Sequence, residues 1–343
     1  MRSLPDRVLD HLQQVADWPD LTATKYEPIE KIGQGGMASV YLARDRELDR
    51  HVAIKVLSDL HADPNVRTRM LEEARIVSRL EHPGIVPIHD SGTLPDGRIY
   101  FAMKWVRGRR LDEFSQSEMP TTDILSIVEK IGLTVAFAHA HGVIHRDLKP
   151  QNIMVGPFGE VLVMDWGVAK QIHAPAVPDD ECLAKQPDAI SISHNQTVAG
   201  AVLGTPGYMA PEQIRGEVNR IDERTDVYGL GGVLYFLLTR RSPGEKAELE
   251  SNMIAPRSWN PAVPRPLEAI CLKALASDPE NRYPSVADLL ADIAAFRAHQ
   301  KVKAYPEGFL TPIWRFISKY RVAILLILAY LAVRIAIEIL KGF

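Results

Sequence analysis

From Tyr26 onward the pattern of apolar and polar positions changes from strand-like to helical as the chain proceeds. Apolar residues at strand spacing predict strands within 26–43, at 52–55 and at 99–103. Only the segment 65–80, between the second and third of these, has the spacing of a helix. We therefore expect a small, mainly β-structured first half.

Helical spacing prevails further along the chain. Residues 121–141 predict a long helix whose apolar face is formed by Ile124, Ile127, Val128, Ile131 and Val135. Two short apolar runs at 153–155 and 161–164 predict a hairpin, and Asp226 stands at the start of another apolar helix. The second half should therefore be mainly helical.

The two ends of the chain differ in character. Leu9, Leu12, Val15 and Ala16 have helical spacing, but we interpret residues 1–25 as a flanking segment. Residues 322–340 are strongly apolar and predict a transmembrane helix. Their Leu, Ile and Val side chains favour insertion by about 4–7 kcal/mol, which Arg334 and Glu338 oppose by at most about 3 kcal/mol each. The alternative is a helix that packs on protein.

Composition narrows the class of protein. Of the 343 residues 46% are hydrophobic and 24% are charged, which is an ordinary globular mixture. The net charge of −3 gives no reason to expect a nucleic-acid partner. The two cysteines, Cys182 and Cys271, indicate neither a disulfide framework nor a metal site. Residues 300–321 form a basic linker, whose Arg315, Lys319 and Arg321 should keep the preceding domain on the cytoplasmic side.

Candidate chemistry is concentrated in the string His145-Arg146-Asp147-Leu148-Lys149-Pro150-Gln151-Asn152. The carboxylate of Asp147 can accept a hydroxyl proton, and the amide oxygen of Asn152 can bind a divalent metal. The ammonium group of Lys149 can offset charge on a phosphoryl group in transfer. A second candidate is the glycine-rich stretch 32–40, which is followed by Lys55 on a strand. Because that loop leads into a strand and not a helix, neither a P-loop nor a dinucleotide-binding fold fits.

These motifs resemble the bacterial eukaryotic-like (Hanks-type) serine/threonine protein kinases, from about Tyr26 to about His299. The resemblance implies an α+β, bilobal kinase fold, with an N-lobe at 26–103, a hinge at 104–108 and a C-lobe at 109–299. It implies ATP and Mg²⁺, or alternatively Mn²⁺, as cofactors. The expected ATP contacts are Ile32, Gly33, Gln34, Gly35, Gly36, Met37, Ala38, Ser39, Val40, Lys55 and Met103.

The same resemblance assigns further roles. Asp147, Lys149, Asn152 and Asp165 are the expected catalytic residues, with Asn152 and Asp165 as metal ligands. Lys55 needs a carboxylate partner, for which Glu73 is the first candidate and Glu72 the second. Trp166 replaces the phenylalanine of the Asp-Phe-Gly motif, Ala38 replaces the third glycine, and Lys104 and Arg107 stand where acids are frequent.

Regulatory and structural residues follow from the resemblance as well. Activation-segment phosphorylation would place charge beside Arg146, with Thr197 as the first candidate acceptor and Ser191 and Ser193 after it. Thr205 together with Lys149 is typical of serine/threonine specificity. Glu212 is expected to pair with Arg282, and Asp226 is expected to accept backbone amides of the catalytic loop.

The sequence therefore predicts a serine/threonine protein kinase at the inner membrane, with protein substrates that include its own activation segment. A homodimer would allow phosphorylation of one copy by another. Two other classes stay open: a pseudokinase that acts as a nucleotide-binding scaffold, and a small-molecule kinase. The pseudokinase usually lacks one of the catalytic groups, and the small-molecule kinase usually lacks the Ala210-Pro211-Glu212 segment; all of these are present here.

Overall fold

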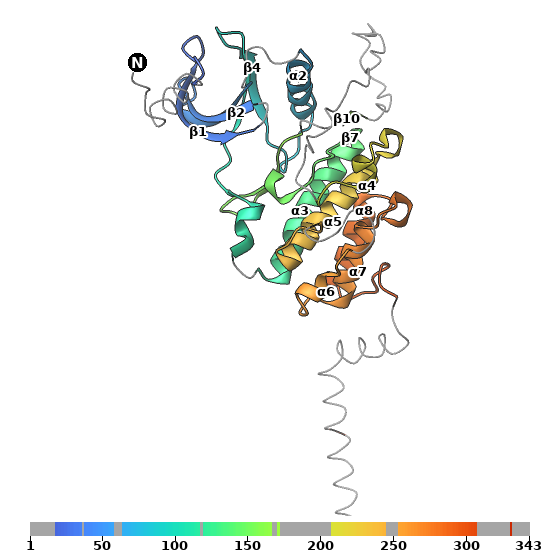
Figure 1. Cartoon of the computed structure of the whole chain (residues 1–343). Coiled ribbons are helices and arrows are strands. Elements are labelled where there is room, and N and C mark those ends of the chain that lie inside the picture. The colour runs from blue at the N-terminus through green and yellow to red at the C-terminus, as the bar shows by residue number, and fades with distance from the viewer. Residues whose placement is uncertain are drawn as a thin grey trace, which may run out of the picture.

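The computed structural model describes residues 18–35, 38–57, 64–116, 119–166, 170–171, 207–244 and 253–306, together with Tyr330. A strand-rich lobe and a helix-rich lobe are visible in Figure 1. The elements of the first lobe are β1 (Tyr26–Gln34), β2 (Ala38–Asp45), β3 (Arg50–Leu57), α2 (Pro64–Ser78), β4 (Ile88–Thr93) and β5 (Ile99–Lys104).

The N-lobe sheet is antiparallel and has the order β1-β2-β3-β5-β4. Because side chains alternate along a strand, Val52, Ile54 and Val56 of β3 face one side and Lys55 faces the other. The first side is a hydrophobic cluster that also contains Leu21, which is only 2% exposed. The segment 18–25 thus covers the outer face of the sheet. On the other side, α2 packs against Leu57 and Phe101 through Met70 and Ala74.

The second lobe is built mainly from helices. Its helices are α3 (Thr121–Ala140), α4 (Pro211–Ile214), α5 (Glu223–Thr239), α6 (Pro256–Trp259), α7 (Arg265–Ala274) and α8 (Val286–Arg297). Its short strands are β6 (Arg109–Arg110), β7 (Val143–Ile144), β8 (Ile153–Val155), β9 (Val161–Val163) and β10 (Lys170–Gln171). Short 3₁₀ helices occur at η1 (Leu111–Gln116), η2 (Pro150–Asn152), η3 (Val218–Arg220) and η4 (Pro279–Asn281).

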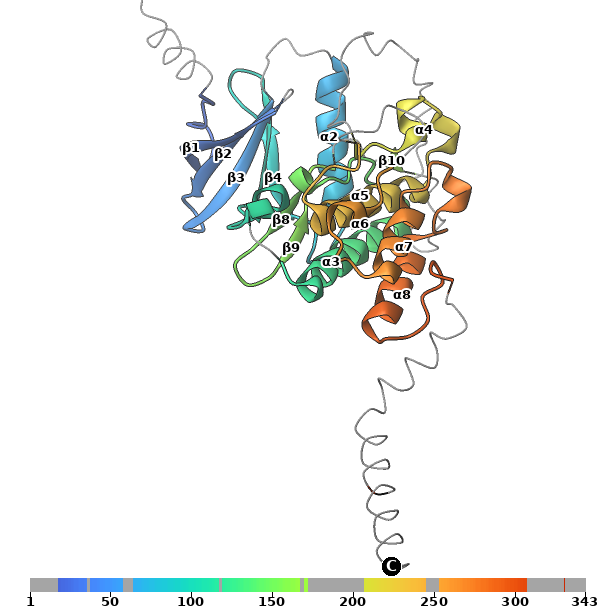
Figure 2. The same ribbon diagram turned by 60° about the horizontal axis from the view of Figure 1, so that its bottom comes forward.

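Helix α5 is the centre of the C-lobe. Every residue from Thr225 to Leu238 is buried, so the helix has no polar face, as expected of a helix enclosed by others. Helices α3, α7 and α8 surround it, and Figure 2 shows the same grouping from a second direction. Close approach is possible at two glycines: a Cβ on Gly229 would lie 2.7 Å from the Cβ of Leu148, and one on Gly231 would lie 2.8 Å from that of Ala274.

The last part of the C-lobe is attached by one buried carboxylate. Asp292 of α8 accepts hydrogen bonds from the hydroxyl of Tyr283 at 2.9 Å and from the backbone amides of Lys303 and Ala304 at 2.8 and 2.9 Å. Val302 beside them is 3% exposed. The segment 301–306 is therefore fixed to α8.

The described helices and strands agree closely with the predicted ones. The helix predicted at 65–80 is α2, the one at 121–141 is α3, and the hairpin is formed by β8 and β9. No helix within the described ranges is both long and apolar enough to span a bilayer. The predicted transmembrane segment 322–340 lies outside those ranges except for Tyr330, as do residues 1–17.

Candidate active site

The catalytic loop is held in place by the buried carboxylate of Asp226 at the start of α5. One oxygen accepts the backbone amide of His145 at 2.8 Å and the other accepts that of Arg146 at 2.7 Å, as predicted. The ring of His139 in α3 lies 2.7 Å from the same carboxylate. Burial alone would raise the pKa of Asp226, but the contact with His139 and the amide of Arg146 lower it below its ordinary value. Asp226 therefore stays ionised.

Asp147, Lys149 and Asn152 converge as the sequence predicted. The Lys149 ammonium donates to the Asp147 carboxylate at 2.7 Å. The Asn152 amide nitrogen donates to the backbone and side-chain oxygens of Asp147 at 2.8 and 2.9 Å. The amide oxygen of Asn152 has no hydrogen-bond partner among the described residues. It is therefore available as a metal ligand.

Lys55 of β3 reaches Glu73 of α2, which settles the choice between the two candidate glutamates. Its ammonium lies 2.8 and 3.0 Å from the two carboxylate oxygens of Glu73 and 3.4 Å from Asp165. Burial by itself would lower the pKa of Lys55, but the two carboxylates together raise it above its ordinary value. Lys55 is thus a charged group held between the carboxylates of Glu73 and Asp165.

Asp165 lies next to the catalytic loop, because the residue before it, Met164, contacts two residues of that loop. The amide of Met164 donates to the carbonyl of Asn152 at 2.7 Å, and the carbonyl of Met164 lies 2.9 Å from the His145 ring. The next residue, Asp165, has a positive φ of 57°, an uncommon conformation for a residue other than glycine. The end of β9 is therefore joined to the catalytic loop one residue before Asp165.

The glycine-rich stretch is formed by β1 and β2, and β2 is paired with the strand that carries Lys55. Gly33 is paired with Val40 across β1 and β2, and the amide of Gly35 donates to the carbonyl of Ala38 at 2.8 Å. Val40 is in turn paired with Lys55, which links the loop to the lysine. Ile32, Gln34 and Ser39 lie on the same two strands. Gly36 and Met37 lie outside the described residues.

Met103 lies at the end of β5, opposite Ala53 of β3, where the strand passes into the predicted hinge. In that hinge the guanidinium of Arg107 stacks on Trp105, with 4.7 Å to the ring centre, and the Trp105 ring is 5.4 Å from that of His51. Arg107, which stands where acids are frequent, therefore packs on Trp105 within the hinge.

The predicted pair of Glu212 and Arg282 is present and fully buried. Two hydrogen bonds of 2.8 and 2.7 Å join the guanidinium to the two carboxylate oxygens, and the Thr225 hydroxyl adds a third at 3.0 Å. Burial raises the pKa of Glu212, but the hydrogen bonds from Arg282 outweigh it and lower the pKa. The pair joins the start of α4 to the turn before α8.

Arg146 adopts a positive φ of 70°, and its Nε is buried without a hydrogen-bond partner among the described residues. Burial lowers its pKa. The candidate phosphate acceptors Ser191, Ser193 and Thr197, and also Thr205, lie outside the described residues.

Two supporting contacts were missed by the sequence interpretation. His139 bonds to Asp226, and the side-chain amide of Gln213 donates to the carbonyl of Arg146 at 2.8 Å. The partners are 87 and 67 residues apart in sequence, so no local spacing pattern could have signalled them. Both contacts secure the backbone around Arg146 and Asp147.

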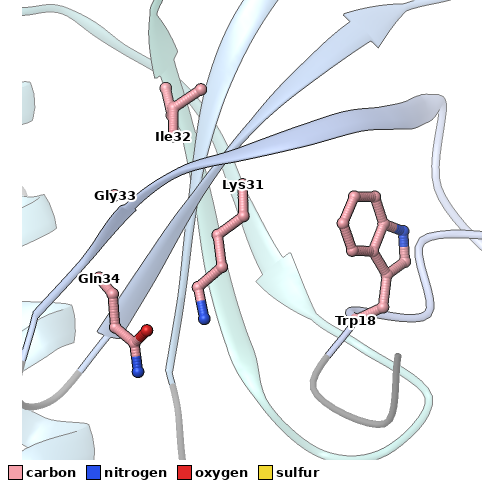
Figure 3. A pocket seen from close by; sticks show the side chains of 5 residues that line it. All are labelled: Trp18, Lys31, Ile32, Gly33 and Gln34. Carbon is pink, nitrogen blue, oxygen red and sulfur yellow. The ribbon is translucent and has the colours of Figure 1, made fainter. Parts of the chain in front are cut away.

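A further pocket lies beside β1 and is lined by Trp18, Lys31, Ile32, Gly33 and Gln34. In Figure 3 the side chains of Lys31 and Gln34 extend to the side of β1 on which Trp18 lies, and Ile32 extends to the other side. The Trp18 ring packs edge-on against Tyr41 of the outer-face cluster, 5.5 Å away. Ile32, Gly33 and Gln34, which line this pocket, are also among the expected ATP contacts.

The donor set suits a magnesium–nucleotide complex. The described residues contain no group of three or more His, Cys, Asp or Glu side chains able to hold a metal by themselves. Mg²⁺ is commonly held by only one or two protein oxygens, with phosphate and water oxygens completing its shell. Asp165 and the free amide oxygen of Asn152 fit that requirement.

Known proteins resemble this chain in sequence and in fold. The protein kinase domain family matches residues 26–293. Serine/threonine-protein kinase PknD of Chlamydia muridarum is 39% identical over an alignment of 290 positions, which covers 77% of this chain and 31% of that protein. The protein of the same name from Protochlamydia amoebophila is 39% identical over an alignment of 293 positions, which covers 78% of this chain and 29% of that protein.

This chain thus spans less than a third of the length of these two relatives. The crystal structure of the Mycobacterium tuberculosis PknI kinase domain superposes with a TM-score of 0.59 at 24% sequence identity, and covers 79% of this chain and 96% of that one. That likeness shows a shared bilobal fold. With the match over residues 26–293, it places the chain in the protein kinase domain family.

Proposed function

We propose that the protein is an ATP-dependent serine/threonine protein kinase. The observation that carries this proposal is a continuous series of contacts from Lys55 to the catalytic loop. Lys55 bonds to Glu73 and Asp165, and the residue before Asp165 is bonded to Asn152, whose amide bonds to Asp147. Both relatives compared above bear the name serine/threonine-protein kinase. The presence of both Lys149 and Thr205 in the sequence is typical of kinases that act on serine and threonine hydroxyls.

The geometry supports a separate role for each of three residues. Lys55, held by Glu73, would bind the α- and β-phosphates of ATP beneath the glycine-rich strands. The carboxylate of Asp147 would orient the acceptor hydroxyl and take its proton as the oxygen attacks the γ-phosphorus. Lys149, already 2.7 Å from Asp147, would stabilise charge on the phosphoryl group in transfer.

Asn152 and Asp165 are the residues that would hold Mg²⁺, which supplies charge neutralisation at the phosphates when bound. Mn²⁺ has similar preferences for oxygen ligands and could replace it. The bond from Asn152 to Asp147 orients the amide so that its oxygen stays free for this purpose.

Transfer of radiolabelled phosphate from ATP to a generic protein acceptor tests the assignment. The variant Asp147→Asn keeps the shape of the side chain but cannot take a proton, so we expect the rate to fall by about 10²–10⁴-fold. Equal transfer by the variant and the parent protein would remove Asp147 from the proposed role.

We also propose phosphorylation of the chain's own activation segment. The buried, unpartnered Nε of Arg146 supports this, because a phosphate nearby would supply the missing acceptor. Thr197 is the first candidate acceptor, and Ser191 and Ser193 follow. One copy could phosphorylate another within a homodimer. Mass spectrometry of the protein after incubation with ATP, with Asp147→Asn as the negative control, locates the modified residue.

The final proposal concerns location. The apolar run at 322–340 and the cations at 315, 319 and 321 favour a single membrane helix, with the kinase domain on the cytoplasmic face of the inner membrane.

A further inference from the structure

The tip of the hairpin between β8 and β9 presents an apolar side chain to solvent. Phe158 is 93% exposed, more than any other exposed large hydrophobic side chain of the described residues. Hydrogen bonds close the turn around it, from the Phe158 amide to Glu160 at 3.0 Å and from the Lys130 ammonium to the Gly159 carbonyl at 2.6 Å. A single exposed apolar residue is ordinary on a protein surface, so its surroundings decide what Phe158 does.

Helix α3 links this tip to the place where the chain leaves the C-lobe. Lys130 of α3 contacts the hairpin, and the adjacent Glu129 is ion-paired with Arg297 at the end of α8. Leu133 follows Lys130 by three residues, so it lies on the same side of the helix, where it is 52% exposed. Figure 2 shows α3 between the β8–β9 hairpin and α8. The hairpin tip, the exposed side of α3 and the end of α8 therefore form one face.

The charge of this face is positive. Lys301 and Lys303, which follow α8, are exposed and form no ion pair within the described part of the chain. Together with Lys130 and Arg297 they outnumber the carboxylates of the two contacting glutamates by two charges. Exposed apolar side chains beside clustered cations are typical of surfaces that lie on anionic lipid. We call this surface the exit face; its residues are Phe158, Leu133, Lys130, Arg297, Lys301 and Lys303.

The course of the chain places the exit face near a bilayer. Residues 301–306 are held on α8 by Asp292, so the chain leaves the domain from this face. The apolar run proposed as a membrane helix begins at Val322, and residues 307–321 can extend no further than about 50 Å. Such a tether gives the lipid surface a high local concentration at the exit face. Contacts that are too weak to bind a membrane by themselves then become occupied.

We propose that the exit face lies on the anionic surface of the membrane, with the Phe158 ring among the lipid headgroups and the lysines beside lipid phosphates. This rests on the proposed membrane location and adds to it which side of the kinase domain faces the bilayer. A lipid surface is favoured over a protein partner because the chain's own proposed anchor leaves the domain here. The kinase domain is then held in one orientation to the membrane.

The full-length protein in vesicles tests this contact. Cys182 is replaced by serine, Cys271 is buried and does not react, and a single new cysteine carries an environment-sensitive fluorophore. The label is placed by Phe158→Cys or, as the matched control, by Leu48→Cys. Leu48 is also an exposed apolar residue, 61% exposed in the turn between β2 and β3 of the N-lobe, and reports the label's own affinity for lipid. Vesicles contain phosphatidylcholine alone or with phosphatidylglycerol, each with and without a spin-labelled quenching lipid.

The label at position 158 should lose roughly half of its fluorescence or more to the quenching lipid in anionic vesicles, and the label at position 48 should not. Quenching at 158 should decrease in neutral vesicles and in the double variant Lys301→Gln, Lys303→Gln. The double variant Arg75→Gln, Arg79→Gln removes the same charge from exposed positions of the N-lobe and should leave the quenching unchanged.

Equal quenching at positions 158 and 48, or equal quenching at 158 in neutral and anionic vesicles, overturns the proposal. A spectral shift at 158 that grows with protein density, without quenching by lipid, would assign the exit face to a second copy and also overturn it. Protein that does not float with the vesicles would contradict the proposed membrane location itself. Protein that floats but shows no quenching at 158 would leave that location intact and remove only the contact of the exit face.

Discussion

Glu73 and Glu72 are adjacent in sequence, yet only Glu73 bonds to Lys55. Successive residues of a helix are separated by about 100° around its axis, so one faces the cleft when the other does not. Glu73 is 9% exposed, and its carboxylate takes two hydrogen bonds from the lysine. The ion pair of Lys55 and Glu73 therefore depends on the rotation of α2 about its axis as well as on the distance between α2 and β3.

This difference makes the two glutamates a matched pair for mutagenesis. Glu73→Gln removes the charged partner of Lys55 and should lower kcat/KM for ATP by about tenfold to a hundredfold, the kinetic equivalent of one charged hydrogen bond. Glu72→Gln should leave kcat/KM unchanged. Steady-state kinetics at varied ATP decides, and equal losses in the two variants would contradict the assignment.

Stability should depend on pH through Glu212 and Asp226. Both carboxyl groups have a pKa below the ordinary value in the folded protein, so the unfolded chain binds protons more readily. Their contribution is complete above the unfolded pKa of about 4 and is lost as the pH falls through the lower folded pKa. The unfolding temperature should therefore decrease as the pH is lowered below about 5.

Glu212→Gln is the control for this prediction. It breaks the buried pair with Arg282 and should lower the free energy of unfolding by about 3–5 kcal/mol near neutral pH. Its unfolding temperature should also change less with acidification than that of the parent. If the two proteins show parallel pH profiles, Glu212 does not contribute to the acid sensitivity.

Much of the site at this scale was predictable from sequence. The residues Asp147, Lys149, Asn152 and Asp165 belong to short strings whose spacing is itself informative. His139 and Gln213 were not predicted, because each acts through a partner brought near only by folding. A lone histidine near a helix end or a lone glutamine carries no signal in a single sequence.

At the scale of elements, α5 supports the catalytic loop through a close approach at Gly229. Its Cα faces Leu148, which lies between Asp147 and Lys149, and an added methyl group would come within 2.7 Å of the Leu148 Cβ. Gly231, on the same helix, instead faces Ala274 of α7.

The two glycines allow stability and catalysis to be separated. Gly229→Ala and Gly231→Ala should each destabilise the fold by about 1–3 kcal/mol through overpacking. Only Gly229→Ala displaces the catalytic loop, so kcat of the folded protein should fall by roughly tenfold or more in that variant alone. Thermal unfolding and initial rates below the transition provide both values. Similar kcat losses in the two variants would show that α5 acts only on stability.

Element boundaries were predicted well where periodicity is strong, as for α3. The covering of the outer sheet face by residues 18–25 was not predicted. Its apolar contacts come from Trp18, Pro19 and Leu21, which are too few to give a repeating pattern. By contrast, the burial of residues 225–238 in α5 agrees with its sequence, which is apolar on all sides.

For the whole molecule, the main expectation concerns membrane attachment. The full-length protein should sediment with membranes, and a variant lacking residues 320–343 should be found in the supernatant after centrifugation. The physical reason is that the apolar run favours insertion by about 4–7 kcal/mol, which Arg334 and Glu338 oppose by at most about 3 kcal/mol each, so the narrow balance favours spanning. Extraction with alkaline carbonate distinguishes an inserted helix from a surface contact. Sedimentation of the truncated variant as well would locate the attachment elsewhere.

The attachment of residues 301–306 to α8 has a mechanical consequence. Two hydrogen bonds from Lys303 and Ala304 to the buried carboxylate of Asp292, which Tyr283 also contacts, tie this stretch to α8. A force applied to the chain after residue 306 would therefore be transmitted to α8 and the helices packed against it. Asp292 is thus the point at which an external force would enter the catalytic domain.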